Sequence, residues 1–122
     1  MIDVFETNNT NLVSFRLSGQ IGAEDIDVIA DILEKKFDSQ EFVDLYIEIA
    51  DDLEESFGGL FEQAKKGFSV ILPNLGKLRK AALVSDKTWL HKVTDFKDIF
   101  FSMEMKAFKF PEKEIAREWV EI

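Results

Sequence analysis

The feature that most constrains the fold of this chain is an alternation between two hydrophobic periodicities. In some segments apolar residues occur at every second position, which is typical of strands. In the segments between them they recur every three or four positions, which is typical of helices. Strands that alternate with helices favour crossover connections and therefore a mostly parallel sheet. We predict an α/β fold of the order β-β-α-β-α-β-α-β-α, with helices on both faces of the sheet.

The first half of the chain contains a predicted hairpin, a helix and a strand. Residues 2–5 and 12–17 are predicted strands, and the turn-forming residues 8–11 join them as an antiparallel edge hairpin. Residues 22–37 predict a helix with an acidic first turn and a basic last turn, as the helix dipole favours. Its apolar face comprises Ile26, Ile29, Ala30, Leu33 and Phe37. Residues 43–49 alternate again, and we expect one apolar face and an opposite face with Asp44, Tyr46 and Glu48.

The second half continues the same alternation. The short apolar run of residues 81–84 predicts a strand covered on both faces, and residues 88–103 predict a helix. Residues 106–110 are the last predicted strand, after which Pro111 opens a final helix at a position that proline tolerates. The predicted buried face of this helix comprises Ile115, Trp119 and Ile122.

Composition excludes several classes of function. The length of 122 residues suits one domain, and no linker divides the chain, so we predict a single domain over residues 1–122. The net charge of −9 opposes nucleic acid as the main partner, because phosphate groups require a basic surface. With no cysteine and one histidine, the chain has no cysteine-ligated zinc and no multi-histidine metal site. An acidic start without a signal-peptide pattern, and no apolar stretch of roughly 20 residues, predict a cytoplasmic protein.

The segment of residues 51–80 differs in charge from the rest of the chain. From residue 63 to residue 85 there is no acidic residue, but there are five basic ones. Apolar residues lie inside this basic window. Apolar surface flanked by cations suits an amphiphile with an anionic head, or the surface of an anionic membrane. The alternative is a crossover helix with a basic, solvated outer face.

We predict a binding site for an apolar or amphipathic small molecule at the carboxyl ends of the central strands, beneath this segment. The apolar wall of the predicted site comprises Phe57, Phe61, Phe68, Ile71, Trp89 and Phe100. The residues predicted to meet an anionic head group are Lys65, Lys77 and Arg79. Gly58 and Gly59 are predicted hinges that let the segment move as a lid. The alternative is that these aromatic residues, which include four of the 12 phenylalanines of the chain, are ordinary core.

Evidence for catalysis is weak at the level of sequence. Asp51 and Asp52 follow a predicted strand, where paired carboxylates are able to hold Mg²⁺ or serve a hydrolase, but acidic loops are usually solvated. His91 stands alone beside an apolar helix face, and no nucleophile elbow, phosphate loop or dinucleotide-binding motif is present. We therefore expect neither an enzyme nor a cofactor or metal site.

Three stretches together resemble one protein family. These are residues 18–25, residues 79–89, and residues 106–110 followed by Ala116, Trp119 and Val120. They resemble the turn into the first helix, the buried fourth strand and the closing strand and helix of SpoIIAA-like proteins. The resemblance covers nearly the whole chain. It implies a STAS-like α/β fold that is similar in architecture to CRAL-TRIO lipid-binding domains.

The resemblance implies two functions. The first is binding of a lipid-like molecule, with peripheral attachment to the inner face of a membrane. The alternative is a regulatory partner switch of the anti-sigma-factor-antagonist type. That switch uses an Asp-Ser-Ser-Gly motif, and this chain has Glu55-Ser56-Phe57-Gly58 at the corresponding place, so Ser56 stands where the phosphorylated serine would be. A serine there also suits a helix N-cap. We further expect that the chain forms a homo-oligomer or binds a regulatory protein.

Overall fold

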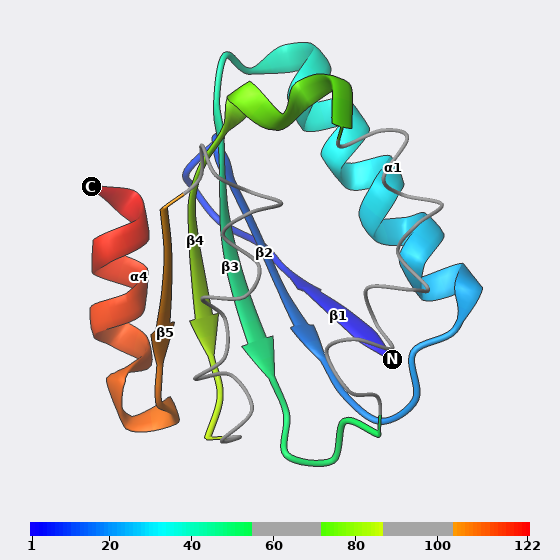
Figure 1. Cartoon of the computed structure of the whole chain (residues 1–122), viewed down its shortest axis with the longest axis vertical. Helices are drawn as coiled ribbons and strands as arrows, with labels where there is room; N and C mark the ends of the chain where they lie inside the picture. The colour runs from blue at the N-terminus through cyan, green and yellow to red at the C-terminus, as the bar shows by residue number, and fades with distance from the viewer. Residues whose placement is uncertain (55–71, 87–103) are drawn as a thin grey trace.

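The computed structural model describes residues 1–54, 72–86 and 104–122 (Figure 1). The predicted helix over residues 88–103 lies entirely outside the described residues. The described elements are β1 (Ile2–Phe5), β2 (Leu12–Leu17), α1 (Ala23–Ser39), β3 (Val43–Ile49), η1 (Leu72–Lys77), β4 (Leu78–Val84), β5 (Glu104–Phe108), η3 (Phe110–Glu112) and α4 (Lys113–Glu121).

The five described strands form one sheet in the order β1-β2-β3-β4-β5. β1 pairs with β2 in the antiparallel direction, and every later pair is parallel. The sequence-based prediction of a mostly parallel sheet with an antiparallel edge hairpin is therefore confirmed. Figure 1 shows the two described α-helices on opposite sides of the sheet, α1 at one side and α4 beside β5.

Each face of the sheet has its own buried core. On one face Ile26, Leu33 and Phe37 of α1 pack against side chains from β2, β3 and β4. This confirms most of the predicted face of the helix. On the other face Ala116 and Val120 of α4 pack against Leu12, Tyr46, Ala82 and Val84. We refer to these as the α1 face and the α4 face.

The beginning of α1 follows the predicted electrostatics. The Asp25 carboxylate accepts a hydrogen bond from the Gly22 N–H at 3.0 Å, so an anion lies where the helix leaves N–H groups without backbone partners. Lys36 lies in the last turn. The helix continues to Ser39, two residues beyond the predicted end.

Strand β3 is buried on both faces, although its sequence alternates between apolar and polar residues. Asp44, Tyr46 and Glu48 point to the α4 face, and their exposed fractions are 0%, 0% and 7%. β3 is the central strand, and residues of α1 and α4 pack on its two faces. Its polar side chains must therefore find partners inside the protein.

Three boundaries differ from the predicted ones. β4 begins at Leu78 rather than at residue 81, because Leu78 already pairs with β3 and Lys80 with β5. β5 spans Glu104–Phe108 rather than 106–110. Pro111 lies in the short η3 turn, and α4 begins only at Lys113.

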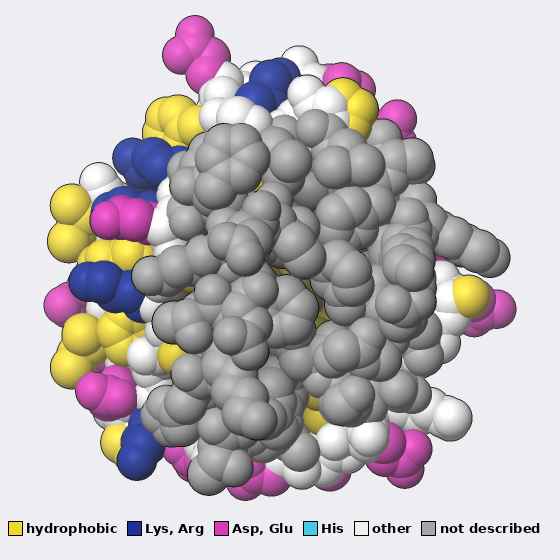
Figure 2. All heavy atoms as spheres, viewed as in Figure 1, with side chains coloured by type: hydrophobic (Ala, Val, Ile, Leu, Met, Phe, Trp, Pro, Cys, Tyr) yellow, Lys and Arg dark blue, Asp and Glu magenta, His cyan; other side chains and the backbone are white. Residues whose placement is uncertain are grey.

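The predicted buried face of the last helix is wrong for Ile115 and Ile122, whereas Trp119 packs partly buried against the core as predicted. Ala116 and Val120 are fully buried, whereas Ile115 and Ile122 are 57% and 80% exposed. The small Ala116 side chain lets the helix approach Tyr46 and Ala82. The side chains of Ile115 and Ile122 consequently face away from the sheet. Trp119 lies at the boundary, with its ring 6.0 Å from that of Phe108. Along the edge formed by β5 and α4, hydrophobic side chains reach the surface between basic and acidic ones (Figure 2).

The position of α4 leads to a prediction about stability. Val120→Ala removes buried methyl groups and should lower the free energy of unfolding by roughly 1–3 kcal/mol. Ile115→Ala alters an exposed position and should change it by less than about 0.5 kcal/mol. Urea denaturation followed by circular dichroism measures both. A larger loss for Ile115→Ala than for Val120→Ala would contradict the observed helix face.

Candidate functional site

The two described cations of the predicted site lie at the amino end of β4. Lys77 ends η1 and Arg79 is the second residue of the strand. The carboxyl end of neighbouring β3 is at Ile49, and the two strands are parallel, so the two cations lie at the opposite end of the sheet from Asp51. Their role in ligand binding stays a prediction, but they do not lie at the edge where we expected the site.

Arg79 forms a salt bridge with Asp44. Its Nε and Nη2 atoms donate to the two carboxylate oxygens at 3.0 Å and 2.6 Å. The register between β3 and β4 shifts at Asp44, which lets Arg79 and Lys80 lie opposite this one residue. The guanidinium also lies 4.3 Å from the centre of the Phe42 ring. These contacts satisfy a carboxylate that is completely buried.

The electrostatics of this pair follow from its geometry. Hydrogen bonds to Asp44 raise the pKa of Arg79 above its ordinary value. Lys77 is also occupied, because its ammonium donates to the Phe37 carbonyl at the end of α1. An anionic ligand that recruited Arg79 would have to compete with a buried carboxylate.

The other predicted site residues lie outside the described residues. They are Phe57, Phe61, Phe68, Ile71, Trp89, Phe100, Lys65, the hinges Gly58 and Gly59, the serine Ser56, and also His91. Their predicted roles therefore stay predictions.

Asp51 and Asp52 lie in the exposed turn that follows β3. One Asp52 carboxylate oxygen accepts a hydrogen bond from the Gly19 N–H at 3.3 Å. Gly19 has a φ of 58°, a conformation that favours glycine. This contact links the turn after β3 to the connection between β2 and α1. Among the described residues there is no group of three or more side chains arranged to hold a metal ion.

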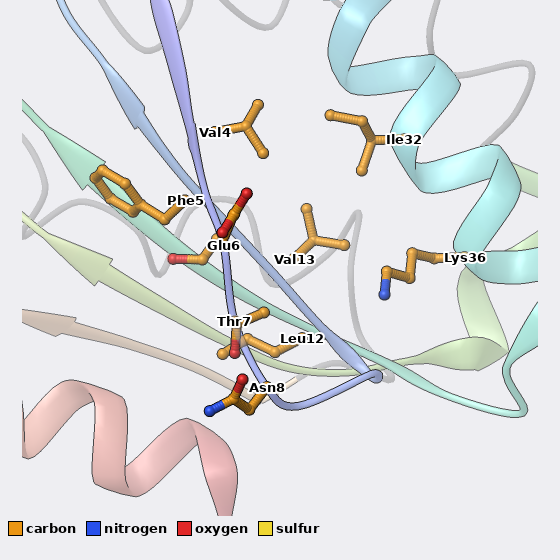
Figure 3. Close-up of a pocket in the computed structure, with 10 residues that line it drawn as sticks. Val4, Phe5, Glu6, Thr7, Asn8, Leu12, Val13, Ile32 and Lys36 are labelled. Atoms are coloured by element: carbon orange, nitrogen blue, oxygen red, sulfur yellow. The ribbon is translucent and has the colours of Figure 1, made fainter.

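A groove that the sequence did not indicate lies between the β1–β2 hairpin and α1 (Figure 3). Its volume is about 600 Å³. Val4, Val13 and Ile32 point toward one another across it, and Lys36 lies at one end. Val4 is 48% exposed, and the Lys36 ammonium donates to the Thr10 carbonyl at 2.7 Å. We call this the β1 groove.

The sequence carried a weak signal for this groove. Ile32 lies one position before the core residue Leu33, outside the face of α1 that the periodicity marks. Val28 also lies outside that face and is 47% exposed. Apolar residues that do not fit the core stripe of a helix indicate a second contact surface. We based the predicted site on the basic window of residues 63–85, so it did not include Val28 or Ile32.

A buried polar pair lies on the α4 face. The Tyr46 hydroxyl donates to Glu48 Oε1 at 2.9 Å, and the Arg117 guanidinium lies 5.4 Å from the centre of the Tyr46 ring. Burial and the hydrogen bond to Glu48 raise the pKa of Tyr46 above its ordinary value. The phenol is therefore held neutral as a hydrogen-bond donor.

No helix in the described part of the chain is both long and apolar enough to cross a bilayer.

Tyr46 gives a prediction on pH dependence, because it is the only tyrosine in the chain. The unfolded phenol should titrate near pH ~10, whereas the native phenol should stay protonated well above that value. The unfolded state then binds fewer protons, so the free energy of unfolding should fall as the pH rises above ~10. Tyrosinate absorbance of native and denatured protein measures the two pKa values. If the phenol of the native protein titrates at the same pH as that of the denatured protein, the hydroxyl of Tyr46 is not buried against Glu48 as described.

Comparison with known proteins bears on the family. A family model described as SpoIIAA-like matches residues 12–121. No curated protein sequence matches the chain. Among solved structures, the chain is similar to an uncharacterised protein with a SpoIIAA-like fold from Shewanella loihica PV-4, with 17% identity and a TM-score of 0.62, over 98% of this chain and 92% of that chain.

Two further solved structures show the same fold. The anti-sigma factor antagonist SpoIIAA in its unphosphorylated form has 13% identity and a TM-score of 0.55, over 98% of this chain and 96% of that one. The Bacillus cell fate determinant SpoIIAA in its phosphorylated form has 14% identity and a TM-score of 0.56, over 97% and 99%. Since the family model spans residues 12–121, which is most of the chain, the protein belongs to the SpoIIAA-like family.

Proposed function

We propose that this chain is a non-catalytic, protein-binding regulatory module that receives an extended segment of a partner protein along β1. The observation that carries the proposal is the combination of an open strand edge with the β1 groove beside it. Extended segments commonly bind by adding a strand to such an edge, with side chains placed in adjacent pockets.

The backbone of β1 supports this mode of binding. The Met1 carbonyl accepts from the Ser18 N–H at 3.0 Å, which fixes the alternation of the antiparallel ladder. The backbone groups of Ile2 and Val4 consequently point away from β2. Of the strands that the structure describes, none pairs with this outer edge. An incoming strand would therefore find donors and acceptors that are not used inside the sheet.

The chemistry of the groove indicates the kind of partner segment. Val4, Val13 and Ile32 provide an apolar wall, so the partner should present apolar side chains at alternate positions. Asp3 is exposed on β1, Glu6 is exposed just after it, and the whole chain carries a net charge of −9. These charges favour a partner segment that also carries basic residues.

The comparisons support a protein partner. Two similar structures are described as an anti-sigma factor antagonist and as a cell fate determinant in its phosphorylated form. A regulatory role controlled by phosphorylation agrees with the prediction for Ser56, which lies outside the described residues. Single phosphorylation at Ser56 in protein from its own cells, found by mass spectrometry, would support that part of the proposal.

A second candidate function is binding of an amphipathic small molecule. Lys36 favours it, because its ammonium lies at the end of an apolar groove and no carboxylate within the described residues pairs with it. The anionic head of a lipid-like ligand would meet Lys36, and its tail would lie along Val4 and Ile32. Peripheral membrane attachment and a relation to CRAL-TRIO domains are further predictions of the same candidate.

Photo-crosslinking tests the protein-binding proposal. A photoreactive phenylalanine analogue at position 4 should give a discrete adduct with one protein in the native cells. The same analogue at position 115, exposed on α4, should not.

Val4→Pro removes an outward N–H without breaking a hydrogen bond to β2. It should weaken binding of the identified partner segment by roughly tenfold, a loss expected for about one or two hydrogen bonds.

Ile115→Asp, at an exposed position of α4, is the control and should leave binding unchanged. Partner binding that survives Val4→Pro would contradict the proposal. Native mass spectrometry separates the two candidates, because a lipid-like molecule that co-purifies and is lost in Lys36→Gln favours the small-molecule function.

A further inference from the structure

A second pocket lies on the α4 face, between the β1–β2 turn and α4. Its volume is about 410 Å³, which is within the range of small-molecule pockets, roughly 300–1,000 Å³. Its polar lining comes from three parts of the fold: Glu6 and Asn8 from the turn, Ser14 and Tyr46 from the sheet, and Arg117 and Glu121 from α4. It shares Glu6, Thr7, Asn8, Leu12 and Ser14 with the β1 groove, but its remaining lining residues include Tyr46 and Arg117 on the α4 face.

The floor of this pocket contains a buried hydroxyl for which the described residues supply no partner. Ser14 is 4% exposed, and within the described residues its side chain makes no hydrogen bond. Buried polar groups in native proteins nearly always have a partner, and an exception calls for an explanation. Ser14 lines the pocket, so a bound molecule is able to supply the missing hydrogen bond.

Arg117 is placed over the same floor. Ser14 and Tyr46 are register partners in neighbouring strands, and the Arg117 guanidinium lies 5.4 Å from the centre of the Tyr46 ring. The ring holds the cation by a cation–π interaction. The phenol proton is already used in the bond to Glu48. Arg117 also forms a hydrogen bond with the Tyr46 side chain. In the described part of the chain no carboxylate forms an ion pair with Arg117, so its other N–H donors are available to a ligand.

The charges of the pocket specify the class of ligand. One side offers the guanidinium of Arg117, and the lining also includes the carboxylates of Glu6 and Glu121. An arginine fork matches the geometry of a carboxylate, and the acidic side chains favour an ammonium group. A simple anion would be opposed by the two acids, and a simple cation by Arg117.

We propose that the pocket on the α4 face binds a zwitterionic small molecule of the amino-acid class. Its carboxylate contacts Arg117, its ammonium group contacts Glu6 or Glu121, and a hydrogen bond forms to the Ser14 hydroxyl. This site shares part of its lining with the β1 groove, but Tyr46, Arg117 and Glu121 line this pocket and not the groove. The proposal does not depend on a partner segment that binds along β1.

Isothermal titration calorimetry with each of the standard L-amino acids, at millimolar concentration, tests the proposal. At least one should bind the full chain. Arg117→Gln and Ser14→Ala should each weaken its binding by roughly tenfold, as expected for loss of one hydrogen bond to a charged or buried group. Arg16→Gln is the matched control and should not weaken it. Arg16 is exposed on the same face of the sheet but does not line this pocket.

A modified ligand shows which group Arg117 contacts. The α-amide of the amino acid that binds most tightly has no carboxylate. It should bind wild type and Arg117→Gln with equal, weak affinity. An equal loss for the amide and the amino acid on Arg117→Gln would indicate only a structural effect and would overturn the assignment.

Other outcomes also overturn the proposal. They are binding of no amino acid, binding that survives both Arg117→Gln and Ser14→Ala, and equal competition by inorganic phosphate, which would indicate a site for anions only. Val4→Pro should leave amino-acid binding unchanged. A failure of this proposal is therefore distinguishable from a failure of the proposal for β1.

Discussion

The rest of the structure depends on the burial of β3 on both of its faces. A central strand that carries Asp44, Tyr46 and Glu48 is stable only if each polar side chain finds a partner without water. Arg79 from β4 satisfies the aspartate with two hydrogen bonds, and Tyr46 and Glu48 satisfy each other. These pairs fix the register of the central strands, because a slip of one residue would expose apolar side chains and bury unpaired charges.

The same pairs determine which parts of the surface remain open. α4 contacts β4 and β3 through Ala116 and Val120, so it lies over one half of its face of the sheet. The hairpin half of that face is then lined by Ser14, the exposed Arg16 and the turn of residues 6–11. On the opposite face α1 contributes Ile26, Leu33 and Phe37 to the core, and its residues Ile32 and Lys36 border the β1 groove. Both candidate binding surfaces therefore border the antiparallel hairpin.

The sequence predicted the hairpin, α1 and β3 because each has a strong local period that agrees with its tertiary environment. It did not predict the face of α4. That helix has nine residues and two overlapping apolar stripes, and contact with Ala82 and Tyr46 decides between them.

The predicted site grouped Lys77 and Arg79 with the carboxyl edge because they are near in sequence. Lys77 and Arg79 lie at the amino end of β4, however, which in a parallel pair is at the opposite edge of the sheet from the carboxyl end of β3. The β1 groove and the Ser14 pocket are formed by residues that are distant in sequence, so no local motif marks them.

The strand order has a consequence for how the protein forms. Each strand pairs with the strand that precedes it in the chain, so the sheet is ordered in space as it is in sequence. Among the described strands, none is inserted between two strands that precede it in the chain. During synthesis the hairpin is able to form first and to serve as a template for β3, after which β4 and β5 join in turn. Loop closure is then confined to successive short intervals, which limits the time during which an unpaired central strand is exposed to aggregation.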